Sequence, residues 1–226
     1  MKFAIAAALA AFAAGAQADE ATKPLPSPVL DRTAPTPAMK SETAVLAGGC
    51  FWGMQGVFQH VKGVTEVVSG YAGGKKESAQ YETVSDGDTG HAESIRITFD
   101  PREVSFGQIL RVYFSVMDPT ELNYQGPDHG TQYRSEIFAT SPTQTKIASA
   151  YVVQLDKAHQ FGAPIVTKVG QFTGFYPAED YHQDYLIHHP DQPYIAYNDI
   201  PKVETLKKLY PALWREKPVM VFPERS

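Results

Sequence analysis

Cysteine is almost absent from this chain: among 226 residues, only Cys50 carries a thiol. A disulfide within the chain is therefore excluded, which leaves a catalytic thiol, an intermolecular disulfide or a small buried apolar side chain. Basic charge is also scarce, with 20 Lys and Arg against 25 Asp and Glu and a formal net charge of -5. This mild acidity argues against nucleic acid and against an anionic membrane surface as partners.

Long apolar runs are missing as well, since none reaches the ~20 residues that a membrane-spanning helix needs. The apolar run at residues 3–14 follows Lys2 and precedes the small residues 15–18 and the acidic pair Asp19 and Glu20. These are the parts of a secretory signal peptide, so we expect residues 1–18 to be removed after Ala18. The mature protein would then be periplasmic or secreted. An uncleaved anchor is the alternative.

The chain after the predicted cleavage site divides into a linker and a domain. Residues 19–40 are rich in proline and have almost nothing to pack, which is typical of an extended linker. Its prolines are Pro24, Pro26, Pro28, Pro35 and Pro37. Residues 41–226 can bury one sizeable core, since 43% of the whole chain is hydrophobic, and we expect a single domain there.

Apolar periodicity predicts an α+β domain. The first six elements follow the order β-α-β-β-α-β, which matches a two-layer split βαβ (ferredoxin-like) core with a mixed sheet. We expect strands at residues 43–47, 63–71, 92–99 and 135–139, and helices at 50–61 and 106–114.

The remaining stretches are predicted to connect and surround this core. Residues 75–90 and 123–132 are polar and indicate loops. A helix at 142–158 opens on Pro142, and a strand near 164–169 follows it. The rest is expected to be a long, loop-rich C-terminal region with short helices, such as one at 203–210.

Cys50 lies at the turn between the first predicted strand and the first predicted helix. Gly48 and Gly49 precede it, and Phe51 and Trp52 follow it. Glycine allows a tight turn, and the free N–H groups at the positive end of the helix would lie near the sulfur. Such a setting lowers the pKa of a thiol, and the thiolate is the nucleophile. We therefore expect Cys50 to be catalytic.

Glu93 is a carboxyl that the strand pattern places among apolar side chains. Side chains two residues apart share a face, so Glu93 falls on the same side of its strand as Ile95, Ile97 and Phe99. Burial there would raise its pKa and keep it protonated near neutral pH. An ordinary glutamate at a strand end, facing solvent or an arginine, is the alternative.

The sequence around Cys50 resembles the active-site signature of the methionine sulfoxide reductase A family. The signature is GCFWG at residues 49–53. Further matches follow in the family's order: GYAGG at 70–74, YE at 81–82, GHAE at 90–93, FDP at 99–101, DPT at 118–120, DHGTQYRS at 128–135 and AEDYHQ at 178–183. The resemblance runs over residues 43–200 and so covers most of the chain.

This resemblance implies an activity, a peptide-methionine (S)-S-oxide reductase that repairs proteins after oxidative damage. The Cys50 thiolate would attack the sulfur of methionine-(S)-sulfoxide, free or in proteins, while Glu93 acts as the acid toward the oxygen. Methionine would leave, and Cys50 would become a sulfenic acid.

The resemblance also implies a set of substrate-binding residues. Phe51 and Trp52 would form a wall for the S-methyl group. Tyr81 and Tyr133 match tyrosines that hydrogen-bond the sulfoxide oxygen, and Asp128 matches a carboxylate near the substrate.

The chain departs from the family pattern because it has no second cysteine to resolve a sulfenic acid. An external thiol must then regenerate Cys50, either a small thiol or a thioredoxin-like electron donor. No cofactor is expected beyond this reductant, and we expect a monomer.

Other functions are compatible with parts of the pattern. If His91 or His182 activates Cys50, the protein would be a cysteine hydrolase. A binding module is a further alternative, in which Phe51 and Trp52 hold methionine side chains of a partner and no reaction takes place. His182 with His188 and His189 is a weak candidate for a metal site, because the spacing is irregular and no acidic or cysteine ligands accompany it.

Overall fold

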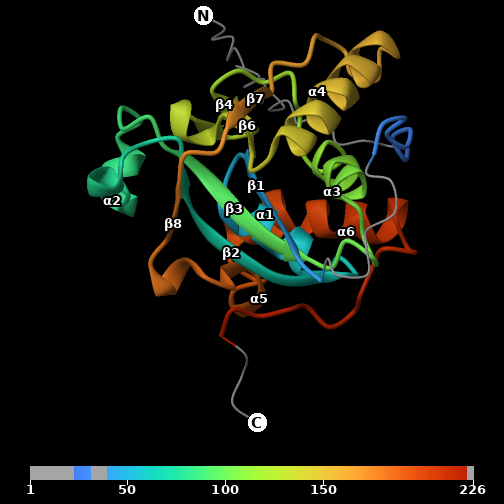
Figure 1. Cartoon of the computed structure of the whole chain (residues 1–226). Coiled ribbons are helices and arrows are strands. Elements are labelled where there is room, and N and C mark those ends of the chain that lie inside the picture. The colour runs from blue at the N-terminus through green and yellow to red at the C-terminus, as the bar shows by residue number, and fades with distance from the viewer. Residues whose placement is uncertain (1–22, 32–39, 223–226) are drawn as a thin grey trace, which may run out of the picture.

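The computed structural model describes residues 23–31 and 40–222. The predicted signal peptide and residues 19–22 and 32–39 of the predicted linker lie outside these residues. The described chain forms an α+β fold around a six-stranded mixed sheet of order β7-β6-β1-β3-β2-β8 (Figure 1). The strands are β1 (Glu42–Gly48), β2 (Val64–Ala72), β3 (Ala92–Phe99), β6 (Ser135–Ala139), β7 (Lys168–Gln171) and β8 (Phe175–Pro177).

Six α-helices surround this sheet in the described part of the chain (Figure 1). Ser105 caps α3 in a reciprocal capping box with Gln108, and Ser141 caps α4 just before Pro142. The helices are α1 (Phe51–Gln59), α2 (Tyr81–Ser85), α3 (Phe106–Tyr113), α4 (Pro142–Lys157), α5 (Tyr185–His188) and α6 (Ile200–Leu209).

The main core lies on one face of the sheet, between the strands and helices α1 and α3. Leu46 of β1 is opposite Ile95 of β3 and Ile137 of β6, and all three side chains are buried in this core. The other face carries a smaller apolar cluster that includes Val45 and Phe138. Alternation along each strand therefore separates two apolar layers.

The predicted central elements are confirmed, with boundary shifts of a few residues. Strands 92–99 and 135–139 have the predicted ends, whereas α1 begins at Phe51 because Cys50 is its N-cap. Three expectations need correction. The stretch 75–90 contains the 3₁₀ turn Lys76–Ser78 and α2, the stretch 123–132 contains the hairpin of β4 (Tyr124–Gln125) and β5 (Asp128–His129), and the strand expected near 164–169 begins only at Lys168.

The described piece of the proline-rich segment, residues 23–31, contains no helix or strand but packs on the domain. Leu25 is 3% exposed and belongs to the main core. Its carbonyl accepts a hydrogen bond from Arg111 Nε at 2.6 Å, and its N–H donates to the hydroxyl of Tyr210 at 3.1 Å. The expectation that this segment has almost nothing to pack is therefore wrong at Leu25.

The C-terminal region is anchored to the sheet by Gln183. Its amide donates to the carbonyls of Ser69 and Ala178, at 2.9 and 3.1 Å, and accepts from Ser69 N and Gln55 Nε2, at 2.9 and 3.0 Å. The chain that follows Gln183 then runs across α1. Within the described residues, no helix is long and apolar enough to span a membrane.

Candidate active site

Cys50 lies at the junction of β1 and α1, as the N-cap of the helix. Gly49 before it has φ +88°, and a Cβ there would lie 2.6 Å from Gln125 Cγ, so both backbone conformation and space require glycine. Cys50 is 6% exposed and unpaired. The predicted position of the thiol at a strand-to-helix turn is confirmed.

The pKa of the Cys50 thiol does not follow the sequence-based expectation of a lowered value. Burial raises it well above its ordinary value, and the charges of Glu93 and Asp199 raise it further. The backbone N–H of Trp52 lowers it, but this contribution is smaller. The helix N-terminus is present, yet desolvation and nearby carboxylates outweigh it.

Glu93 lies next to this turn, on the face of β3 that the alternation predicts. Its side chain is 3% exposed, and its Oε2 accepts a hydrogen bond from the backbone N–H of Phe51 at 3.0 Å. Burial raises the pKa of Glu93 to about 8, despite the opposing effect of that hydrogen bond. The carboxyl is therefore mostly protonated at neutral pH and can donate a proton.

Phe51 and Trp52 have different surroundings. Phe51 is 1% exposed and packs in the main core, with ring centroids 5.9 Å from Tyr71 and 5.1 Å from His182. Trp52 is half-buried and stacks on Tyr185 at 4.1 Å. Its Nε1 donates to His182 Nδ1 at 3.1 Å, so the indole is held by both stacking and a hydrogen bond.

Tyr81, Tyr133 and Asp128 come from three separate elements and meet near the thiol. Burial raises the pKa of both tyrosines, and the charges of Glu93 and Cys50 act on both hydroxyls. Burial also raises the pKa of Asp128, whose carboxylate accepts a hydrogen bond from the Tyr194 hydroxyl. The structure thus brings together residues 50, 81, 93, 128 and 133.

Of the two candidate histidine bases, His91 is engaged elsewhere through both ring nitrogens and His182 through Nδ1, whereas the buried Nε2 of His182 has no hydrogen-bond partner. His91 Nδ1 accepts from the N–H of Gly74 at 3.2 Å, and its Nε2 lies 2.9 Å from the carbonyl of Lys75. His182 accepts from Trp52, and burial lowers its pKa. These contacts do not favour the hydrolase alternative. No cluster of His, Cys, Asp or Glu suited to a metal ion occurs within residues 23–31 and 40–222.

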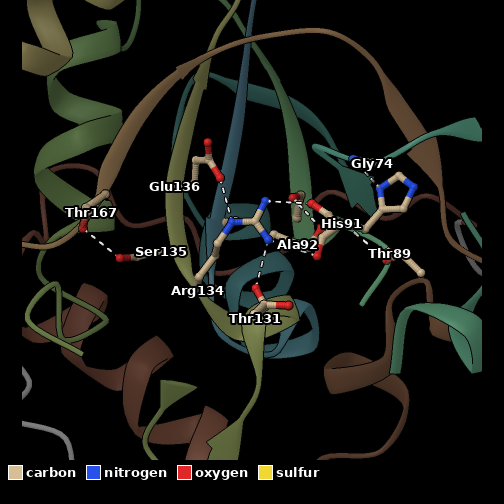
Figure 2. A network of polar contacts seen from close by, with 12 residues as sticks. Gly74, Thr89, His91, Ala92, Thr131, Arg134, Ser135, Glu136 and Thr167 are labelled. Atoms are coloured by element: carbon tan, nitrogen blue, oxygen red, sulfur yellow. Dashed lines mark hydrogen bonds and ion pairs between the residues drawn. The ribbon is translucent and has the colours of Figure 1, made fainter. Parts of the chain in front are cut away.

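Arg134 holds the turn that leads into β3 (Figure 2). Its guanidinium donates to the carbonyls of Gly90 and His91, both at 3.0 Å, and to that of Thr131 at 2.9 Å. It also forms an ion pair with Glu136 at 2.7 Å. Arg134 therefore ties the backbone just before Glu93 to the segment that carries Tyr133.

Three residues near the thiol were missed from the sequence: Tyr194, Asp199 and Lys202. Asp199 ends the π-helical turn η4 (Ile195–Asp199), and Lys202 lies in the first turn of α6. In the sequence, these residues are marked only by a stretch rich in aromatic and acidic residues, which lies far from Cys50 along the chain. A π-helical turn is often found at functional sites, but the sequence does not reveal it.

A buried thiol next to a buried carboxyl whose pKa is raised is an arrangement typical of a cysteine-dependent enzyme that supplies its own proton donor. A family model described as peptide methionine sulfoxide reductase matches residues 42–213. The chain belongs to the methionine sulfoxide reductase A family, whose members are oxidoreductases acting on peptide methionine sulfoxide.

Individual relatives agree with this assignment. The chain is 64% identical over 182 residues to peptide methionine sulfoxide reductase MsrA 2 of Mesorhizobium japonicum, covering 80% of this chain and 93% of the relative. It is 48% identical over 191 residues to MsrA 2 of Synechocystis, covering 84% and 89%. Methionine sulfoxide reductase A of Corynebacterium diphtheriae has a similar structure, with TM-score 0.60, 30% identity, and coverage of 78% of this chain and 91% of that chain.

Proposed function

We propose that this enzyme reduces methionine-(S)-sulfoxide to methionine by direct attack of Cys50, with Glu93 as the acid. The observation that carries the proposal is the buried Glu93 carboxyl, whose pKa of about 8 leaves it a proton to donate at neutral pH. It lies beside the N-cap position of Cys50, since it accepts from the very next backbone N–H, that of Phe51.

The proposed reaction transfers one oxygen atom. The Cys50 thiolate forms a bond to the sulfoxide sulfur while Glu93 gives its proton to the sulfoxide oxygen. The new bond between the Cys50 sulfur and the substrate sulfur and the S–O bond of the substrate then both break, and the oxygen passes with its proton to the Cys50 sulfur. Methionine sulfur gains two electrons, Cys50 loses two, and the products are methionine and a Cys50 sulfenic acid.

Regeneration then requires two external thiols, because the chain has one cysteine. The first thiol condenses with the sulfenic acid and releases water, leaving a mixed disulfide on Cys50. The second displaces Cys50 as a thiol and leaves as a disulfide. We propose a small thiol or a thioredoxin-like protein for this role, with no prosthetic cofactor.

The substrate would be held by the residues around the thiol. Trp52 offers an aromatic face to the S-methyl group, with Phe51 behind it in the core. The hydroxyls of Tyr81 and Tyr133 would hydrogen-bond the sulfoxide oxygen, and Asp128 would lie near the rest of the substrate. Support for this assignment comes from the charges of Glu93 and Cys50, which act on both tyrosines.

Three broader expectations accompany this function. We propose a single monomeric domain over residues 41–226 whose core is a split βαβ unit, supported by the strand order β6-β1-β3-β2 and its antiparallel pairings. We also propose export after cleavage at Ala18, with protein repair in the periplasm or outside the cell. Mass spectrometry of the exported protein should find Asp19 at its N-terminus, and Met1 there would contradict cleavage.

The test of the reaction is a single turnover without reductant. We expect one methionine per protein and a mass gain of about one oxygen atom, trappable by a sulfenic-acid reagent, after one equivalent of a methyl (S)-sulfoxide. Cys50→Ser should form no methionine. Wild-type protein with a free thiol that forms no methionine and gains no mass would refute the proposal.

A further inference from the structure

His182 lies buried among aromatic rings at the end of the 3₁₀ turn η3 (Asp180–His182). The centroid of its ring is 5.1 Å from that of Phe51, 5.7 Å from that of Trp52 and 4.3 Å from that of Tyr81. These three aromatic residues are the ones proposed to surround the substrate together with Tyr133. The imidazole therefore packs against the wall of the proposed substrate pocket.

The ring of His182 makes one hydrogen bond within residues 23–31 and 40–222. Its Nδ1 accepts from the indole Nε1–H of Trp52 at 3.1 Å, whereas its Nε2 is buried and has no hydrogen-bond partner. A buried polar atom without a partner is unfavourable, and an apolar ring would fill the same aromatic surroundings without that cost. The feature that requires an imidazole at this position is therefore the acceptor at Nδ1.

Glu179 favours the form of the imidazole that can accept. An Nδ1 that accepts a hydrogen bond carries no proton, so the neutral ring holds its proton on Nε2. The Oε2 atom of Glu179 lies 4.0 Å from Nε2, which is too long for a hydrogen bond, but a carboxylate favours a proton on the nitrogen that faces it. Glu179 is itself fixed, because it accepts from the N–H of Tyr81 at 3.0 Å and from the hydroxyl of Tyr71 at 2.9 Å. Burial lowers the pKa of His182 and keeps the ring neutral, although Glu179 acts in the opposite direction.

The hydrogen bond fixes the orientation of Trp52, because the other contacts of the indole are ring contacts. The indole stacks on Tyr185 at 4.1 Å, with 14° between the planes, and meets Tyr194 edge-on at 6.2 Å. Stacking leaves an indole free to turn in its own plane, whereas a hydrogen bond is directional. The Nδ1 atom of His182 therefore sets which edge of the indole faces the pocket.

We propose that His182 is a positioning residue for substrate binding: its Nδ1 holds the indole of Trp52 in the orientation that meets the S-methyl group of the sulfoxide. The proposal deepens the function proposed above and rests on it, since that function is what gives Trp52 its contact with the substrate. It assigns to His182 neither a contact with the substrate nor a proton transfer.

The first test is the signal of the Trp52 indole N–H in a proton–nitrogen NMR spectrum of the full-length protein. The chain has two tryptophans, so two indole signals are expected, and Trp214→Phe removes the other one. His182→Leu and His182→Asn are a matched pair, since both side chains branch at the same atom and only asparagine has an acceptor there. We expect His182→Leu to shift the Trp52 signal upfield and to speed its exchange with solvent about tenfold or more. His182→Asn should restore much of both.

The second test is the rate of single turnover at increasing concentrations of a methyl (S)-sulfoxide. The concentration that gives half of the limiting rate reports substrate binding, and the limiting rate reports the chemical step. His182→Leu should raise the half-saturating concentration about tenfold, because an indole that is not held must be ordered when the substrate binds. It should lower the limiting rate less than about threefold, since the reacting groups are unchanged. His182→Asn should lie closer to wild type than to His182→Leu.

His60→Leu is the control for the removal of a buried histidine. His60 stacks on Trp214 at 4.4 Å, and its Nδ1 lies 2.9 Å from the carbonyl of Arg215. This variant should leave the Trp52 signal and the half-saturating concentration unchanged. Circular dichroism spectra that match wild type would show that each variant is folded. If His182→Leu does not fold, His182→Phe takes its place, because it keeps an aromatic ring and removes the acceptor.

The outcomes separate this inference from the proposed reaction. Wild-type protein that forms no methionine would refute the reaction and, with it, the role of His182 in substrate binding. If wild type turns over, the inference alone is overturned by an unchanged Trp52 signal or an unchanged half-saturating concentration in His182→Leu. Equal losses in His182→Asn and His182→Leu would also overturn it, since the acceptor would then have no effect. A shifted signal and weaker binding in His182→Leu, both largely restored in His182→Asn, would support it.

Discussion

Replacing Glu93 by glutamine is expected to make the protein more stable at high pH, although it removes the proposed acid. The pKa of this carboxyl rises from an ordinary 4.5 to about 8 on folding. Between these values the folded protein holds a proton that the unfolded chain has released. Stability therefore falls as pH rises from 4.5 to 8, and above pH 8 the full cost is present.

The size of the effect follows from this shift of about 3.5 units. At 1.36 kcal/mol per pKa unit, the ionisable Glu93 lowers the free energy of unfolding by about 5 kcal/mol above pH 8. Most of this loss arises between pH 5 and pH 9. Glutamine does not ionise, and its amide oxygen can still accept from the N–H of Phe51. Glu93→Gln should thus gain several kcal/mol over wild type at pH 9 and little at pH 5.

Urea unfolding at pH 5 and pH 9 measures this difference through the free energy of unfolding of each protein. Glu66→Gln is a matched control, because Glu66 is on neighbouring β2 with its side chain 50% exposed. Its effect should change by less than about 0.5 kcal/mol between the two pH values. If Glu93→Gln gains less than about 1 kcal/mol from pH 5 to pH 9, the carboxyl is not held protonated and the reasoning fails.

Three further outcomes are expected. In single turnovers the rate of methionine formation should rise with pH and level off near pH 8, because Glu93 loses its proton there. The rate of the slower Glu93→Gln variant should continue to rise with pH. Identical pH profiles for the two proteins would contradict this. Leu25→Ala should lower the free energy of unfolding by about 2 to 5 kcal/mol in urea, and a loss under about 0.5 would show that residues 23–31 do not pack. Arg134→Met should cost about 2 to 4 kcal/mol by the same assay, since carbonyls and Glu136 lose their charged donor, and an unchanged midpoint would remove Arg134 from this role.

Much of the fold followed from local pattern. The strand at residues 92–99 was predicted with its observed ends, because alternation of apolar residues is a property of the strand itself. The helices after Ser105 and Ser141 carry their start signals in the sequence. The short helix α2 was missed, since its five residues show no sustained apolar period.

The candidate site was predictable where motifs carry it and not elsewhere. Cys50 was found from its strand-to-helix turn, a local feature, whereas strand alternation alone left the role of Glu93 open and the match GHAE at residues 90–93 decided it. Asp199 and Lys202 were not found, because the path of the C-terminal region, which Gln183 ties to the sheet, is what brings Asp199 against the first turn of α1. Leu25 was overlooked because its packing depends on α3 and Tyr210, far along the chain.

By itself, the sequence determined that one thiol lies at a strand-to-helix turn, that a carboxyl shares a face with apolar side chains, and that no second cysteine can resolve an oxidised Cys50. The tertiary structure decided the protonation of these groups. Helix position predicted a lowered thiol pKa, but burial and the charges of Glu93 and Asp199 raise it instead. The reason is physical: charge interactions depend on distance in space and on exclusion of water, and both are set only when distant segments of the chain pack together.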